Sequence, residues 1–92
     1  MSEVRIMTLI SGKVQGVGFR YWTREEARAL GITGFVRNLS DGRVEALFEG
    51  DTKSVERMLD LLKMGPPHAR VQDIEVDRDE YLGQYRSFDI ER

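Results

Sequence analysis

Runs of apolar residues with two different spacings divide the chain into strands and helices. Short apolar or alternating runs predict five strands, at residues 4–11, 33–39, 43–49, 71–77 and 87–91. The first run is apolar on both faces, so we expect it to be a central strand. After the first strand, apolar residues recur at three- to five-residue steps, which is typical of an amphipathic helix packed on a sheet. After the third strand, an apolar face predicts a second helix, formed by Val55, Met58, Leu59 and Leu62.

Glycines, prolines and capping residues mark where these elements end. Gly31 ends the first predicted helix, and the Gly-Pro-Pro run at 65–67 ends the second. Asp51 and Thr52 are good N-caps for the second helix. The apolar positions of strand 71–77 change phase once, which predicts a bulge or a late start of that strand.

The start of the first helix has two interpretations. Residues 23–26 have the form of a capping box, which would begin the helix at Thr23. A helix whose N-terminus binds an anion would begin near residues 19–21 instead. We favour the earlier start, because only then do the free N–H groups at the helix end face the loop that precedes it.

This order of elements predicts the fold class. Strand, helix, two strands, helix and strand, followed by a terminal strand, is typical of a ferredoxin-like α+β sandwich. We expect an antiparallel sheet with both helices on one face and a short C-terminal fifth strand. A chain of 92 residues fits one small domain, so residues 1–92 are interpreted as a single domain. The same architecture hosts many functions, so function has to be argued from the site.

Composition excludes several classes of function. Lys plus Arg number 14 and Asp plus Glu number 16, giving a net charge of −2 without a long block of one sign. This argues against nucleic acid or an anionic membrane as a partner. The absence of cysteine excludes disulfides and thiol nucleophiles. Residues 1–3 lead directly into a strand, without the features of a signal peptide or membrane span, so we expect a cytoplasmic protein.

The loop between the first strand and the first helix is rich in glycine, at Gly12, Gly16 and Gly18. Glycine permits positive φ, so successive N–H groups can converge on an anion together with those of the helix start. Arg20 at the loop exit offers two parallel donors to a phosphate or carboxylate. Neither nucleotide-binding motif fits, since Tyr21 stands where the dinucleotide motif needs its third glycine. From these residues alone, an anion site and a simple tight turn remain equally open.

Two long motifs then favour the anion site. The first is Ile-x-Gly-x-Val-Gln-Gly-Val-x-Phe-Arg over residues 10–20, and the second is Gly-Phe-Val-Arg-Asn-x-x-x-Gly-x-Val over residues 34–44, followed by Gly50. In both motifs, in their separation and in the order of elements along all 92 residues, the chain resembles the acylphosphatase family. No motif position departs from the family pattern. Gly18 fills a variable position, where it would make the loop more mobile.

The resemblance implies an enzyme that hydrolyses small acyl phosphates to a carboxylate and inorganic phosphate. It implies that Arg20 holds phosphoryl oxygens and that Asn38 orients the attacking water. The carboxylate leaving group is stable without protonation, so positioning and electrostatic stabilisation can carry the catalysis. This suits a chain whose one histidine, His68, is interpreted as a solvated loop residue. The phosphate-binding residues we expect are Gln15, Gly16, Val17, Gly18, Phe19 and Arg20.

Neighbouring polar residues receive supporting interpretations. Asn38 cannot deprotonate water but can hold it in line; without the resemblance, a turn-forming residue that caps the hairpin is the better interpretation. Arg37 should point to the opposite face of the sheet from Asn38. Gln15 should brace the loop and take no chemical step. Thr23 either adds a hydroxyl near the site or caps the helix.

We expect no cofactor and no metal, because the carboxylates are scattered and the loop N–H groups with Arg20 supply the positive field. The expected partner is a small acyl phosphate, with no nucleic acid, no membrane and no obligate protein partner. Two other functions remain open. A non-catalytic anion-binding module would bind phosphate without hydrolysing it. An RNA-binding module, suggested by residues 16–22, needs its aromatic residues on a strand, whereas here they fall on a predicted helix.

Overall fold

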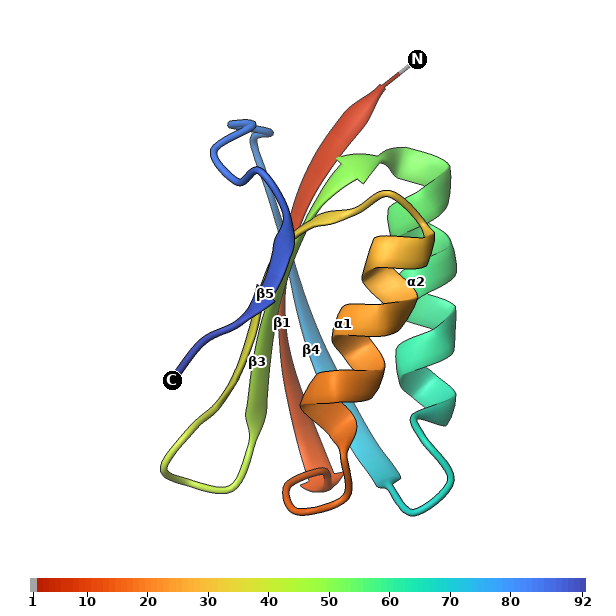
Figure 1. Ribbon diagram of the computed structural model, residues 1–92, viewed down its shortest axis with the longest axis vertical. Helices are drawn as coiled ribbons and strands as arrows, with labels where there is room; N and C mark the ends of the chain where they lie inside the picture. Colours follow the sequence, from red (N-terminus) through yellow and green to blue (C-terminus); the bar gives the residue numbers. More distant parts are fainter. Residues whose placement is uncertain (1) are drawn as a thin grey trace.

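The computed structural model describes residues 2–92, which form a five-stranded sheet covered on one face by two helices (Figure 1). In chain order the elements are β1 (Glu3–Lys13), α1 (Phe19–Ala29), β2 (Thr33–Asn38), β3 (Val44–Asp51), α2 (Thr52–Met64), β4 (Arg70–Asp79) and β5 (Phe88–Ile90). The strands lie side by side in the order β4-β1-β3-β2-β5, so β1 is an inner strand, as its two apolar faces predict. The ferredoxin-like arrangement expected from the sequence is confirmed.

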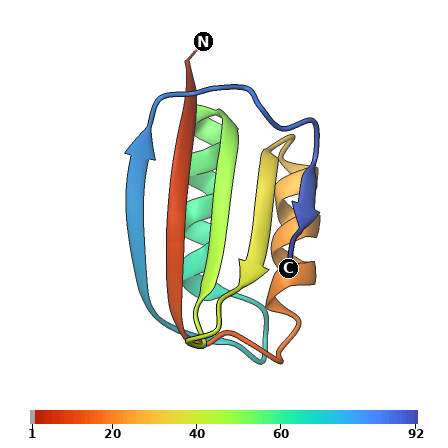
Figure 2. The same ribbon diagram turned by 90° about the vertical axis from the view of Figure 1, so that its left-hand side faces the viewer.

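The four longer strands pair antiparallel, whereas β5 lies parallel to β2, with Gly34 opposite Phe88. The sheet is therefore mixed, a detail that the expectation of an antiparallel sheet did not include. Figure 2 shows the reason, because the chain crosses from β4 on one edge over the end of the sheet where β2 begins. A strand that enters the far edge from that end can only run in the same direction as β2.

The helix boundaries decide between the two starts considered for the first helix. α1 begins at Phe19 with Gly18 as its N-cap residue, and the hydrogen bond from the Trp22 N–H to the Gly18 carbonyl closes its first turn at 3.0 Å. Thr23 lies inside the helix, so the capping-box alternative is wrong. Gly31, with φ 72°, follows the end of the helix as expected.

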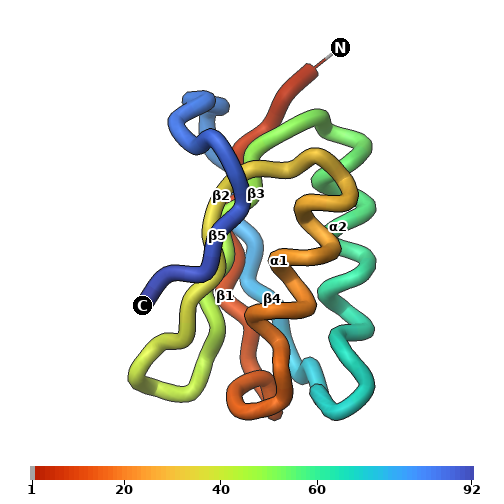
Figure 3. The backbone as a smooth tube through the Cα atoms, viewed as in Figure 1, coloured from red at the N-terminus to blue at the C-terminus, as the bar shows by residue number. Residues whose placement is uncertain are grey.

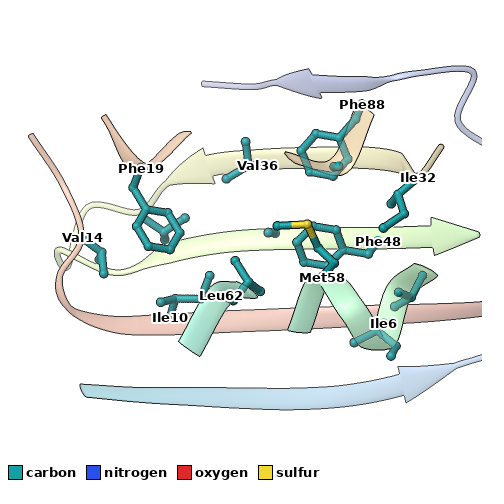
Figure 4. Close-up of a cluster of buried hydrophobic side chains, with 14 residues drawn as sticks. Ile6, Ile10, Val14, Phe19, Ile32, Val36, Phe48, Met58, Leu62 and Phe88 are labelled. Atoms are coloured by element: carbon teal, nitrogen blue, oxygen red, sulfur yellow. The ribbon is translucent and has the colours of Figure 1, made fainter. Parts of the chain in front are cut away.

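Apolar side chains from both helices and from the sheet form one core between the two layers (Figure 4). Phe48 and Phe88 stack with ring centroids 5.4 Å apart, which ties β5 to the centre of the sheet. The helix residues buried in this core are Phe19 and Ala27 of α1 and Val55, Met58 and Leu62 of α2. The core therefore fixes α1 on β2 and β5, and α2 on β1, β3 and β4.

The predicted irregularity in the fourth strand is a bulge. The register between β1 and β4 shifts between Ser11 and Gly12, which pair with Asp73 and Val71. A side chain at Gly12, whose φ is 126°, would place its Cβ 2.1 Å from the Arg70 carbonyl oxygen. The glycine thus lets the two strands approach closely where β1 passes into the loop before α1.

Candidate active site

The sequence-predicted site residues gather at one end of the molecule. The loop of residues 14–18 leads from β1 into α1, and the turn between β2 and β3 lies at the same end (Figure 3). The two segments are joined through Gln15, whose Nε2 donates to the carbonyl oxygens of Leu39 at 2.8 Å and Arg43 at 2.9 Å. The bracing role predicted for Gln15 is confirmed, whereas its membership of the phosphate-binding set stays a prediction.

The loop is held at both ends by buried apolar residues. Val14 and Phe19 are each 1% exposed and belong to the core, in the same part of the cluster (Figure 4). Between them, Gly16 and Gly18 have φ values of 74° and 76°. A Cβ built on either glycine meets nothing within 4 Å, so these glycines are required by backbone conformation and not by close packing. The loop therefore has a fixed frame and an open outer side.

The start of α1 has no side-chain cap. Gly18 adopts the left-handed conformation, no side chain accepts from the first turn, and that turn contains no acidic residue. The N–H groups of a first helical turn have no partner within the helix, and they carry partial positive charge. Arg20 lies in this turn, and it takes part in none of the ion pairs found within residues 2–92. This arrangement is suited to an external anion.

Asn38 ends β2, and its side chain differs in environment from that of its neighbour. Arg37 pairs with Glu45 across the strands at 2.6 Å, on the face of the sheet away from the helices. Asn38 shares its parity with Val36, which is fully buried in the core. Its Oδ1 is buried and accepts no hydrogen bond, so Asn38 does not cap the hairpin through this oxygen. The opposite orientations predicted for Arg37 and Asn38 are confirmed.

Thr23 is the residue whose position the sequence interpretation left open. It is fully buried on the inner face of α1, four residues after Phe19 and four before Ala27. Its Oγ1 has no hydrogen-bond partner. The sequence feature that could have placed Thr23 near the site is its spacing, because a residue three positions after Arg20 lies next to it on the helix surface.

Several features lie away from this site. His68 is exposed in the segment between α2 and β4, as expected of a solvated residue. A groove between α2 and β4 is lined by apolar residues and by charges of both signs, but none of its lining residues belongs to the glycine-rich loop or to β2. Within residues 2–92, no group of three or more His, Asp or Glu side chains could hold a metal ion. No helix in this part of the chain is long and apolar enough to cross a membrane.

Comparisons with known proteins agree on one family. The family model described as Acylphosphatase matches residues 6–90. The chain is 52% identical over 87 residues to a protein of Acaryochloris marina named Acylphosphatase, covering 95% of this chain and 92% of that protein. It is 47% identical over 90 residues to one of Pelotomaculum thermopropionicum with the same name, covering 98% of each.

A solved structure agrees with these matches. The crystal structure of acylphosphatase from Bacillus subtilis superposes with a TM-score of 0.94 at 36% identity. The superposition covers 97% of this chain and 99% of the other. The similarity therefore spans the glycine-rich loop, both helices and the end of β2.

Proposed function

The chain belongs to the acylphosphatase family, and we propose that it hydrolyses the carboxyl–phosphate anhydride bond of small acyl phosphates. Fold alone does not carry this proposal, because the same fold hosts other activities. The observation that carries it is the start of α1, which has no side-chain cap, follows a loop with two positive-φ glycines and contains Arg20 in its first turn.

The phosphoryl group is bound by the loop and the first turn of α1. Residues 15–20 supply the backbone N–H donors, and the first turn of α1 has neither a side-chain cap nor an acidic residue that would compete with the phosphate. Arg20 adds a permanent positive charge and a planar pair of donors that matches two phosphoryl oxygens. Together they stabilise the charge that spreads over the equatorial oxygens in a loose transition state.

Asn38 orients the attacking water. Its carboxamide oxygen is buried at the end of β2 and accepts one hydrogen of the water, which keeps the water in line with the bond that breaks. The water oxygen forms the new bond to phosphorus while the bond from phosphorus to the acyl oxygen breaks. The carboxylate leaves with that electron pair, and the protons of the water end on the phosphate as dihydrogen phosphate. No general acid is needed, because the leaving group is already a stable anion.

The reaction proceeds without a metal ion in this proposal. The N–H groups of the loop and the Arg20 guanidinium supply the positive field that Mg²⁺ supplies in kinases. Incubation with EDTA should therefore leave the rate of hydrolysis unchanged. A rate that falls with EDTA and returns with added Mg²⁺ would contradict this part of the proposal.

The test compares an anhydride with an ester. Benzoyl phosphate should be hydrolysed and glycerol phosphate should not, because benzoate leaves as a stable anion, whereas the alkoxide of an alkyl ester needs a proton to leave. Arg20→Ala should lower kcat/KM for benzoyl phosphate by roughly 10² to 10³, the usual effect of removing one stabilising donor. Arg24→Ala is the matched control, because Arg24 lies on the same helix but pairs with Glu25 at 3.0 Å. Wild-type activity in Arg20→Ala would reject the assignment of Arg20.

The alternative functions give different results. A binding module would bind inorganic phosphate in calorimetry while the wild-type protein leaves benzoyl phosphate intact. The RNA-binding alternative needs aromatic residues on a sheet surface, and here Phe19, Tyr21 and Trp22 lie on α1. No observation on the described residues favours that alternative.

A further inference from the structure

Two buried polar atoms stand out in the part of the chain that the structure describes. Thr23 Oγ1 and Asn38 Oδ1 are buried side-chain atoms without a hydrogen-bond partner. An unpartnered buried polar group costs about 1–3 kcal/mol of stability, and native proteins contain few of them. Each of these two atoms therefore calls for a reason other than folding.

Burial of a threonine does not by itself leave the hydroxyl without a partner in this fold. Thr8 of β1 is also fully buried, and its Oγ1 donates to the Ala46 carbonyl oxygen at 2.9 Å. Valine has almost the shape of threonine and would remove the unpartnered hydroxyl at position 23. The fold therefore explains threonine at position 8, where the hydroxyl makes a hydrogen bond, but it does not explain threonine at position 23.

The two unpartnered atoms come from elements that pack against each other. Thr23 lies on the inner face of α1, one turn after Phe19, and α1 packs on β2. Asn38 shares the helix-side face of β2 with Val36, which belongs to the same core cluster as Phe19. Figure 4 shows Phe19 at the end of this cluster next to Val14, with Val36 beside it towards the middle of the core. The hydroxyl and the carboxamide oxygen therefore face the interior beside the proposed phosphate-binding loop.

We propose that Thr23 is a positioning residue that holds the attacking water together with Asn38, an inference that rests on the proposed function. The Asn38 oxygen can only accept, so the water donates one hydrogen to it. The Thr23 hydroxyl oxygen accepts the second hydrogen of the water. With both hydrogens engaged, the lone pairs of the water remain free and one of them faces phosphorus. A single acceptor would leave the water free to rotate about one hydrogen bond.

The test uses two variants at position 23 and one at position 8. Thr23→Val should lower kcat for benzoyl phosphate roughly tenfold, the value of one hydrogen bond, with KM within about twofold of wild type. Its Tm should stay equal to wild type or rise, because an unpartnered hydroxyl is removed. Thr23→Ser keeps the hydroxyl and should retain most of the wild-type kcat. Thr8→Val, the matched control, should lower Tm and leave kcat unchanged.

A double variant shows whether the two residues act on the same water. If they do, Thr23→Val added to Asn38→Ala should lower kcat little further than Asn38→Ala alone. Full additivity of the two losses would overturn the shared water. A Thr23→Val protein with wild-type kcat, or one whose loss comes with a lower Tm and is not rescued by serine, would overturn the role of Thr23.

These outcomes separate the inference from the function on which it rests. If Asn38→Ala loses activity while Thr23→Val keeps it, the inference fails and the proposed function stands. If the wild-type protein does not hydrolyse benzoyl phosphate, the proposed function fails and takes the inference with it.

Discussion

The two ends of the molecule differ in whether a side chain accepts hydrogen bonds from the backbone N–H groups at the helix start. At the end where α2 begins, the Asp51 carboxylate caps the helix by accepting from Lys53 N and Ser54 N at 3.1 and 3.4 Å. At the end where α1 begins, Gly18 stands in the cap position and no side chain accepts from the first turn. Figure 1 shows that the two helices start at opposite ends of the sheet.

A second carboxylate, that of Glu49, also accepts hydrogen bonds from backbone N–H groups at the end of the molecule where α2 begins. Glu49 is fully buried near the end of β3, and its oxygens accept from the N–H groups of Leu82, Gly83 and Gln84 at 2.8, 3.2 and 3.2 Å. Arg5 approaches the same carboxylate at 3.4 Å. The connection between β4 and β5 is thus fastened to the sheet by an acidic side chain of the chain itself.

From this difference we propose that the end where α2 begins contributes stability and that the end where α1 begins binds the ligand. Where the chain supplies its own anions, the N–H donors are satisfied before any ligand arrives. Where it supplies none, the first turn of α1 has no side-chain cap, and the buried oxygens of Thr23 and Asn38 have no hydrogen-bond partner. Unsatisfied groups lower stability, so their presence in a folded protein calls for a functional explanation, and we propose the binding of phosphate and water as that explanation.

The largest effect we expect comes from Asn38. Asn38→Ala should lower kcat for benzoyl phosphate by roughly 10² to 10³, because the water loses its carboxamide partner. The free energy of unfolding should not fall, since the Asn38 oxygen has no partner to lose. Steady-state kinetics and urea denaturation measure the two quantities. Arg37→Ala is the control, because Arg37 lies on the opposite face of the sheet. A loss of kcat in Arg37→Ala similar to that in Asn38→Ala would contradict the role proposed for Asn38.

The next effect is on stability and arises at the other end of the molecule. Glu49→Ala should lower the free energy of unfolding by roughly 3 kcal/mol, because three N–H groups and Arg5 lose a charged acceptor. The kcat of the folded protein should remain at the wild-type value. Glu45→Ala removes a partly exposed ion pair with Arg37 and should cost under about 1 kcal/mol. If urea denaturation gave equal losses of unfolding free energy for Glu49→Ala and Glu45→Ala, the buried hydrogen bonds of Glu49 would contribute no additional stability.

Acid should lower the free energy of unfolding as well, through Glu49, by a fraction of the loss expected for Glu49→Ala. Burial raises the pKa of Glu49, but the three N–H groups and Arg5 outweigh it, so that its pKa lies below the ordinary value of 4.5. A lowered pKa means that this stabilisation is complete above pH 4.5 and is lost as the pH falls through the folded value. The difference in unfolding free energy between wild type and Glu49→Gln should therefore shrink below that pH. The Arg43 N–H lowers the pKa of Asp41 too, but both proteins retain Asp41.

The smallest effect we expect tests the capped helix. Asp51→Ala should lower the free energy of unfolding by about 1 kcal/mol, the usual value of an N-cap. Inorganic phosphate should raise the Tm of this variant as much as that of wild type, because the ion binds at the start of α1. Thermal denaturation with and without phosphate measures both effects, with Asp60→Ala on the exposed face of α2 as control. If phosphate no longer raised the Tm of Asp51→Ala, the anion would bind at the start of α2 and the proposed site at α1 would be contradicted.

The elements, their order and the fold class could be predicted from the residues alone, because local spacing of apolar residues, glycines and caps decides where strands and helices form. The sequence also identified the glycine-rich loop, Arg20 and Asn38 as candidates, since these residues stand in two long motifs. The expected start of α1 near residues 19–21 followed from the same reasoning and is confirmed, since the helix begins at Phe19.

Which polar groups have hydrogen-bond partners could not be predicted in this way, because it depends on the folded chain. The pairing of β5 with β2, the acceptance of three N–H groups by Glu49 and the link from Gln15 to the β2–β3 turn all join residues distant in sequence. Thr8 and Thr23 are the same residue type in the sequence, yet one hydroxyl meets a carbonyl and the other meets none. Hydrogen bonding depends on what the fold brings within about 3 Å, which no local pattern specifies.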